Sequence, residues 1–173
     1  MNINKIRAFT LVDILITFVI LGLLIVLTIP ALMQDIRREE FKSRLKESIS
    51  IITNAIRNQV ILSGYNMESI NDFADLDKSM TKYITIVDII DGNMPEGCLR
   101  GYKVYSGSVF YYMTTPPCTN DSPCKVMIDI NNDSDPNKYY KKDSSNILGD
   151  RFDIFIYPEK VEYSEDTIKF LIE

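Results

Sequence analysis

Oxygen-bearing side chains recur at alternate positions in one short segment of this chain. The residues are Asp129, Asn131, Asp133 and Asp135. A turning loop can aim side chains with this spacing at one Ca²⁺, and Asp150 or Asp153 could complete the shell. The glycine and the closing glutamate of an EF-hand are missing, because Ser134 and Tyr140 stand in their places. The sequence therefore leaves two interpretations open, a calcium site and a solvated turn rich in Asp and Asn.

A carboxylate with a different consequence is Asp13, which is the only charged residue in the apolar run between Phe9 and Pro30. At about 1.5 Å per residue this run gives roughly 30 Å of helix, enough to cross a bilayer core. An ionised group in hydrocarbon costs about 2.5–3.5 kcal/mol, so we expect Asp13 to have a partner. The alternative is that its side chain reaches the headgroups, since Asp13 stands close to Phe9.

Cysteine and histidine usage limits the remaining chemistry. The chain has no histidine, which excludes Ser-His-Asp and Cys-His catalysis and histidine-ligated zinc. We expect Cys118 and Cys124 to form a disulfide in an oxidising compartment, whereas Cys98 could pair with either of them or stay a buried thiol. We expect no enzyme, because scattered Asp and Glu serve as solubilising charge as well as they would serve a carboxylate hydrolase.

Charge is distributed unevenly along the 173 residues. Residues 1–62 hold eight Lys/Arg and five Asp/Glu and residues 63–173 hold eleven and nineteen, so that +3 and −8 give the net charge of −5. The basic start, MNINKIRA, predicts that this side stays in the cytoplasm. No small-residue cleavage site follows the apolar run, so we expect a retained anchor rather than a secretory signal. The acidic remainder argues against nucleic acid as a partner.

Hydrophobic periodicity predicts one long helix over residues 9–62, whose first half is apolar all round. In its second half apolar residues recur every three to five positions, on a face that needs a partner. This apolar stripe consists of Ile36, Phe41, Leu45, Ile49, Ile52, Ile56 and Val60. Pro30 removes one backbone hydrogen bond and predicts a bend, and Gly64 suits the end of the helix.

The rest of the chain predicts an antiparallel sheet that covers this stripe. Residues 67–87 indicate one or two short helices, and residues 91–97 indicate a loop. We expect strands at 99–105, 108–114, 125–130, 152–157 and 167–172. A Ser106-Gly107 turn joins the first two. The fold class is therefore α+β, with a sheet of three to five strands laid on the long helix.

The segment Ala8-Phe9-Thr10-Leu11-Val12-Asp13, followed by a hydrophobic run that ends at Pro30, resembles the start of the type IV pilin and type II secretion pseudopilin superfamily. This resemblance covers about residues 1–35. A second resemblance joins VMIDINNDSDPN and LGDRFDIFIY to a signature of pilin-like minor subunits. In that superfamily a long N-terminal helix packs on a small antiparallel sheet, which agrees with the pattern of the chain.

The resemblance implies that a prepilin peptidase cleaves between Ala8 and Phe9 and that the new N-terminal Phe9 is N-methylated. It also implies that Asp13 neutralises the terminal amine of a neighbouring subunit and that Pro30 bends the helix. Two residues depart from the family pattern, because Ala8 replaces the usual glycine and Asp13 replaces the usual glutamate. Alanine keeps a small side chain at the cleaved bond, and the aspartate carboxylate reaches one methylene less far.

Together these features predict four parts. They are a leader at 1–8, a membrane half of the helix at 9–30, an amphipathic half at 31–64 and a globular head at 65–173. We expect a minor structural subunit of a type IV pilus or a type II secretion pseudopilus, anchored in the bacterial inner membrane with its head in the periplasm or in an extracellular filament. The partners implied are copies of the chain or other pilin-like subunits, the peptidase that also methylates, and an inner-membrane assembly platform with its ATPase. The alternative is a single-pass anchored domain that binds calcium or another ligand and never polymerises.

Overall fold

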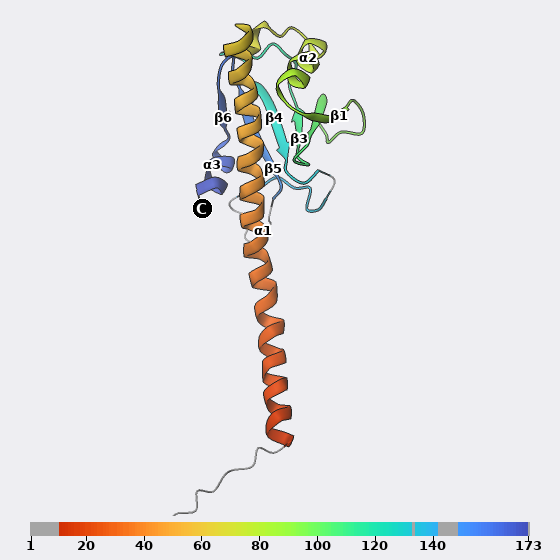
Figure 1. Cartoon of the computed structure of the whole chain (residues 1–173), viewed down its shortest axis with the longest axis vertical. Coiled ribbons are helices and arrows are strands. Elements are labelled where there is room, and N and C mark those ends of the chain that lie inside the picture. The colour runs from red at the N-terminus through yellow and green to blue at the C-terminus, as the bar shows by residue number, and fades with distance from the viewer. Residues whose placement is uncertain (1–10, 133, 142–148, 173) are drawn as a thin grey trace, which may run out of the picture. The chain divides into compact units, whose positions relative to one another are not determined.

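The computed structural model describes residues 11–132, 134–141 and 149–172. The chain separates into two compact units, one within residues 1–39 and the other within residues 40–173. Helix α1 (Leu11–Ser63) contributes to both, supplying an apolar segment to the first unit and a packed segment to the second. The sheet and the shorter helices all belong to the second unit (Figure 1).

The second unit combines helices with one antiparallel sheet, so the predicted α+β class is confirmed. Its elements after α1 are η1 (Met67–Ser69), α2 (Phe73–Tyr83), β1 (Ile86–Ile90), β2 (Arg100–Val104), β3 (Val109–Tyr112), β4 (Cys124–Asp129), β5 (Arg151–Ile156), β6 (Val161–Tyr163) and α3 (Glu165–Ile172). The six strands lie in the order of the sequence, and each is antiparallel to the next.

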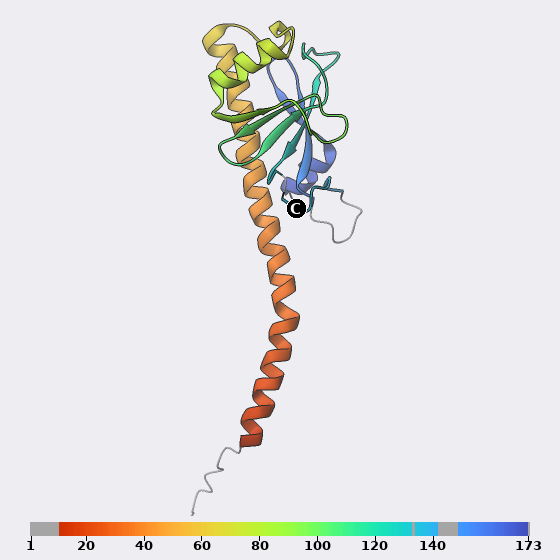
Figure 2. The ribbon, with the colours of Figure 1, turned by 90° about the vertical axis from the view of Figure 1, so that its right-hand side faces the viewer.

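The main core lies between the sheet and residues 40–63 of α1, which run across one face of the sheet (Figure 2). On the helix, the buried part of the apolar stripe is Phe41, Leu45, Ile49, Ile52 and Ile56. On the sheet, the inner face presents Tyr102, Phe110, Tyr112, Val126, Ile128, Phe152, Ile154 and Ile156. Along β2 to β5 every second side chain faces this core, which confirms the predicted packing of sheet on helix.

The opposite face of the sheet carries a smaller apolar group, which we call the outer cluster. It consists of Val109, Tyr111 and Met127, with Ile90, Met94, Cys98 and Met113 packed against them. Gly101 makes room for the ring of Tyr111, because a Cβ there would lie 2.9 Å from a ring carbon. The outer cluster therefore gives the sheet a second, partly covered face.

The C-terminal segment is a helix, so the strand predicted at residues 167–172 is wrong. Ser164 precedes α3, and its hydroxyl accepts a hydrogen bond from the backbone N–H of Thr167 at 3.3 Å. Glu165 pairs with Lys169 at 2.6 Å one turn later. In the helix, the ring of Phe170 packs on the ring of Phe152, with 4.7 Å between the two ring centroids. Capping and packing therefore favour helix over strand.

The edge strands of the sheet are the two that the sequence pattern missed. The short helices predicted within residues 67–87 are confirmed by η1 and α2, but the prediction is wrong at its end, where β1 begins at Ile86. Branched residues in Ile86–Ile90 favour an extended chain beside β2. β6 forms the other edge, in a segment where no strand was predicted. The sheet thus has six strands rather than three to five.

Two turns agree with the glycines predicted for them. Gly64 has a φ of +70° and donates its N–H to the carbonyl of Val60 at 3.1 Å, which ends α1. Gly107 has a φ of +89° and donates to the carbonyl of Val104 at 2.9 Å, which closes the β2–β3 hairpin. The left-handed backbone at both positions favours glycine over residues with a Cβ.

An ion pair fastens α2 to the sheet. The Nε of Arg100 donates to Asp77 at 3.2 Å, and a second guanidinium nitrogen contacts the other oxygen of the same carboxylate. Tyr102 donates its hydroxyl to Asp77 at 2.7 Å, and Arg100 also pairs with Asp91 at 2.7 Å. The arrangement is bidentate and shielded, since Arg100 is 16% exposed. It fixes the helix that closes one side of the core.

Candidate functional site

The apolar start of α1 is exposed throughout. The stretch Leu11–Ile29 is long and apolar enough to cross a membrane, and none of it is buried within the chain. Thr28 donates its hydroxyl to the carbonyl of Leu24 at 2.9 Å, and Thr17 donates to the carbonyl of Asp13. Because these hydroxyls donate their hydrogen bonds to carbonyl groups of the same helix, they need no polar partner outside it, and the surface around them stays apolar.

Asp13 lies in the first turn of α1, on an exposed part of the helix. A carboxylate at this end of a helix is favoured by the helix dipole. The segment therefore combines an acidic group near its start with apolar side chains along the rest of its length. The assembly role expected for Asp13 stays a prediction.

The other residues expected to take part in processing are not all described. Ala8 and Phe9, at the predicted cleavage and methylation site, lie outside the described residues. Pro30 stands within α1, and the helical assignment continues on both sides of it. The bend expected there stays a prediction.

The predicted calcium ligands occupy different environments. Asp129 is 1% exposed and accepts hydrogen bonds from the Nε of Arg151 at 2.9 Å and the backbone N–H of Asn131 at 3.3 Å. Asn131 donates its amide to the carbonyl of Asp135, whose side chain is exposed, at 3.1 Å. Asp133 lies outside the described residues. Within the described ranges no group of three or more Cys, Asp or Glu could hold a metal ion, so calcium binding stays a prediction.

The two further carboxylates considered for this shell have structural partners. Asp150 is fully buried and accepts backbone N–H groups of Asn137 at 2.7 Å and Lys138 at 2.8 Å. Asp153 pairs with Lys125 at 2.8 Å on the outer face of the sheet. Asp150 thus holds the loop against β5, whereas the side chain of Asp153 is directed to Lys125 on the outer face of the sheet.

Burial shifts the pKa of the Asp129 carboxyl group. It raises the pKa of Asp129 from 3.8 to about 6, against the opposing effect of Arg151 and with a further increase from Asp150. Because the folded-state pKa is the higher one, folding takes up a proton between these two values. The contribution of Asp129 to stability is therefore fully present below pH 3.8 and is lost as the pH rises through about 6.

A comparison with Asp129→Asn isolates this effect. We expect the unfolding free energy of the wild type, minus that of the variant, to fall by about 2 kcal/mol between about pH 4 and pH 7, since one pKa unit is worth about 1.4 kcal/mol and part of the change lies below pH 4. Denaturant titrations of the full chain in detergent, with EGTA present, measure the difference. A difference that does not depend on pH, or that increases with pH, would contradict the burial of an ionised Asp129.

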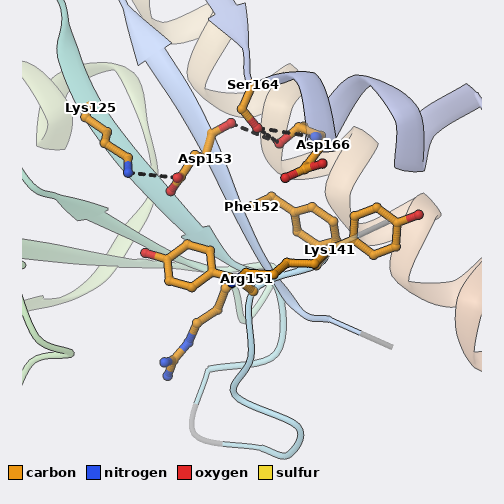
Figure 3. Close-up of a pocket in the computed structure, with 10 residues that line it drawn as sticks. Lys125, Lys141, Arg151, Phe152, Asp153, Ser164 and Asp166 are labelled. Atoms are coloured by element: carbon orange, nitrogen blue, oxygen red, sulfur yellow. Dashed lines mark hydrogen bonds and ion pairs between the residues drawn. The ribbon is translucent and has the colours of Figure 1, made fainter. Parts of the chain in front are cut away.

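A cavity of approximately 280 Å³ lies where β5 meets the start of α3 (Figure 3). Basic side chains (Lys125, Lys141 and Arg151) and acidic ones (Asp153 and Asp166) line it together with aromatic rings. The charges of opposite sign offset each other, so the cavity does not select strongly for an anion or a cation. The sequence carries no signal for it, because its walls come from segments that meet only in the folded chain.

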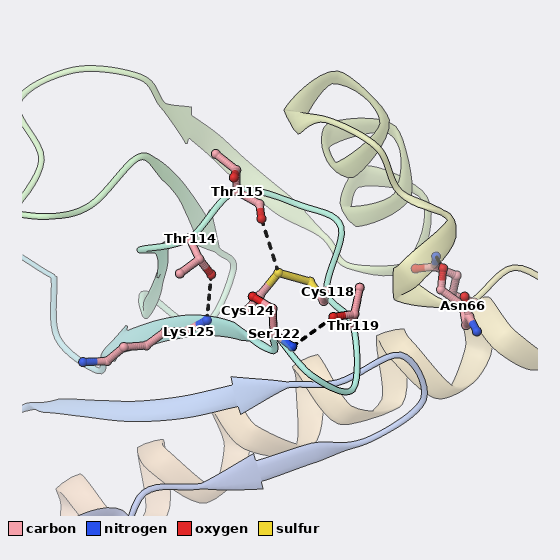
Figure 4. Close-up of a disulfide and its surroundings, with 9 residues drawn as sticks. Asn66, Thr114, Thr115, Cys118, Thr119, Ser122, Cys124 and Lys125 are labelled. Carbon is pink, nitrogen blue, oxygen red and sulfur yellow. Dashed lines mark hydrogen bonds between the residues drawn. A yellow bond between two sulfur atoms is a disulfide. The ribbon is translucent and has the colours of Figure 1, made fainter.

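Cys118 and Cys124 form a disulfide, as predicted (Figure 4). Both residues are buried, and the loop that they close is stabilised by the backbone N–H of Ser122, which donates to the hydroxyl of Thr119 at 2.9 Å. Cys124 faces the main core, whereas Cys98 packs in the outer cluster on the other face of the sheet. Cys98 is therefore a half-buried free thiol, one of the alternatives that the sequence left open.

The disulfide closes a short loop, so its effect on stability is expected to be moderate. For a cross-link between residues six positions apart, loop entropy predicts a loss of about 2 kcal/mol in a Cys118→Ala/Cys124→Ala variant. Denaturant titrations of the oxidised wild type and the variant measure this loss. Reductant should lower the stability of the wild type to that of the variant and leave the variant unchanged. Equal stability of all these samples would contradict the prediction.

No family model, curated protein or solved structure matches this chain. Its function therefore has to be argued from its own residues and fold.

Proposed function

We propose that this chain is a minor, pilin-like structural subunit of a type IV pilus or a type II secretion pseudopilus. The observation that carries the proposal is the stretch Leu11–Ile29, which is apolar all round and has no part buried within the chain. Apolar surface of this extent is stable only against lipid or against other protein. A subunit that leaves a membrane to enter a fibre uses the same surface for both.

The acid in this stretch supports assembly over simple anchoring. A membrane anchor gains nothing from a carboxylate, which costs about 2.5–3.5 kcal/mol in hydrocarbon. In a fibre, Asp13 would pair with the terminal amine of a neighbouring subunit, created when the peptidase releases Phe9. Head-to-tail contacts whose rotation does not close into a ring extend a filament.

The second unit supports the same role. An amphipathic helix covered by an antiparallel sheet agrees with the architecture that the resemblance implies. The head would form the acidic exterior of the fibre, while the stems pack inside. The partners in this proposal are copies of the chain or related subunits, the prepilin peptidase and methylase, and the assembly platform of the bacterial inner membrane.

The mature N-terminus tests the proposal. We expect the chain purified from the membranes of cells that contain a prepilin peptidase to begin at Phe9 and to carry an N-methyl group. Intact-mass spectrometry measures both. An Ala8→Gly variant, which restores the usual family residue, should be processed at least as completely. An intact Met1 in both proteins would contradict the proposal and favour a single-pass anchored domain.

A further inference from the structure

Sulfur atoms gather in the outer cluster. It contains the free thiol of Cys98 and the thioethers of Met94, Met113 and Met127. Methionine also fills irregular gaps in apolar cores, so their presence alone does not indicate a ligand. The relative positions of Cys98, Met113 and Met127 indicate a ligand more specifically.

Two of the methionines are neighbours across adjacent strands. Met127 on β4 pairs with Tyr111 on β3. Met113 follows β3 and donates its backbone N–H to the carbonyl of Lys125 at 2.9 Å. Met113 and Met127 are therefore diagonal partners on the outer face, within reach of each other's long side chains. The hydroxyl of Tyr139 contacts the sulfur of Met113 at 3.9 Å, which places that thioether toward β5.

Cys98 lies over the same part of the sheet. The residue before it is Gly97, where a Cβ would lie 3.4 Å from the terminal methyl of Met113. Burial raises the pKa of the Cys98 thiol, and the charges of Arg151, Asp153 and Lys125 also act on it. Asp153 is the register partner of Met127. The shared cluster and the close approach of Gly97 to Met113 thus place the thiol near the two thioethers.

A buried carboxylate oxygen lies close to Met127, because Asp153 is its register partner on β5. One oxygen of Asp153 pairs with Lys125 at 2.8 Å. The other, Oδ1, is buried and has no hydrogen-bond partner among the described residues. A buried acceptor without a donor is costly, and a nearby cation would reduce that cost.

We propose that Cys98, Met113 and Met127 bind one soft monovalent metal cation, Cu(I). Thiolate and thioether sulfur select Cu(I) over hard cations such as Ca²⁺. The metal replaces the thiol proton of Cys98, the proton passes to solvent, and no oxidation state changes. Met94 packs in the same cluster. This site is separate from the residues of the predicted calcium loop and does not depend on the proposed function.

Titration of the full chain in detergent tests the site, with the Cys118–Cys124 disulfide kept intact and Cys98 as the free thiol. Ag(I), in chloride-free buffer, serves as a redox-inert probe, and Cu(I) is measured anaerobically in competition with bicinchoninate. We expect one equivalent of either ion to bind to the wild type. Cys98→Ser should abolish binding, and Met113→Leu/Met127→Leu should weaken it on the order of tenfold or more, because Leu keeps the volume but removes the sulfur.

Met80→Leu provides the matched control, since Met80 is buried in the main core on the other face of the sheet. Its affinity for either ion should equal that of the wild type. Met113→Leu alone gives a second measurement if the double variant does not fold. The proposal is overturned if the wild type binds neither ion. It is also overturned if the folded methionine variants bind as tightly as the wild type, which would mean that the thiol acts alone.

Discussion

The Gly149→Ala variant is expected to lose about 3 kcal/mol of unfolding free energy, as overpacking of a close contact does. A Cβ on Gly149 would lie 2.3 Å from the backbone nitrogen of Tyr140 and 2.4 Å from its Cα. Both are backbone atoms, so no change of rotamer relieves the contact. The segment that contains Tyr140 would have to move away from β5.

That movement would break an established set of hydrogen bonds. Tyr140 donates its N–H to the carbonyl of Arg151 at 3.2 Å, and Arg151 donates to the carbonyl of Lys138 at 3.1 Å. Asp150, fully buried beside Gly149, accepts the N–H of Lys138 as well. A buried carboxylate that loses its donors is costly, so the effect extends beyond the added methyl group.

Denaturant titration followed by tyrosine fluorescence measures this loss in the full chain. Gly92→Ala is the matched control, because nothing lies within 4 Å of a Cβ at that position and its φ is not positive. We expect the control to change stability by less than about 0.5 kcal/mol. Equal stability of the two variants would show that the loop before β5 is not held close to residues 139–140.

The Asp13→Ala variant is expected to insert into membranes normally and to enter filaments about tenfold less, which corresponds to about 1.4 kcal/mol of lost pairing. Removal of the carboxylate makes the helix more apolar, so insertion does not suffer. The pairing with a neighbouring terminal amine is lost. This expectation rests on the proposed function.

Quantitative detection of the chain in membrane and sheared-filament fractions separates the two effects. Asp13→Glu should keep incorporation near the wild-type level, because it retains a carboxylate at the position where the family carries glutamate. Leu15→Ala, which shortens an exposed apolar side chain two positions away, controls for a general loss of packing. Normal incorporation of Asp13→Ala would remove the assembly role of this residue.

Much of the main core can be predicted from the sequence because it depends on periodicity. The stripe that includes Leu45, Ile49 and Ile52 is readable at helical spacing, and β5 alternates regularly. The disulfide is readable because Cys118 and Cys124 are close in the chain. Local patterns of this kind carry their own information about which side is buried.

Features set by tertiary contacts could not be predicted in this way. The segment 165–172 is apolar enough for a strand, and its helical state depends on Phe170 finding Phe152. The burial of the Asp129 carboxylate depends on its ion pair with Arg151, which is distant in sequence. The candidate sulfur site has no sequence motif, because Met127 lies on β4, Met113 follows β3 and Cys98 lies in the loop before β2.

The order of the strands has a consequence for how the head folds. Because every strand pairs with the one that follows it, the sheet forms between segments that are neighbours in sequence, through short loops at β2–β3 and β5–β6 and longer ones elsewhere, and it has a low contact order for a β-rich protein. Short loops lose little entropy on closure, so hairpins can add one after another without a distant segment. The docking of residues 40–63 of α1 on the sheet joins parts of the sequence that are far apart, and we expect this docking to limit the rate of folding.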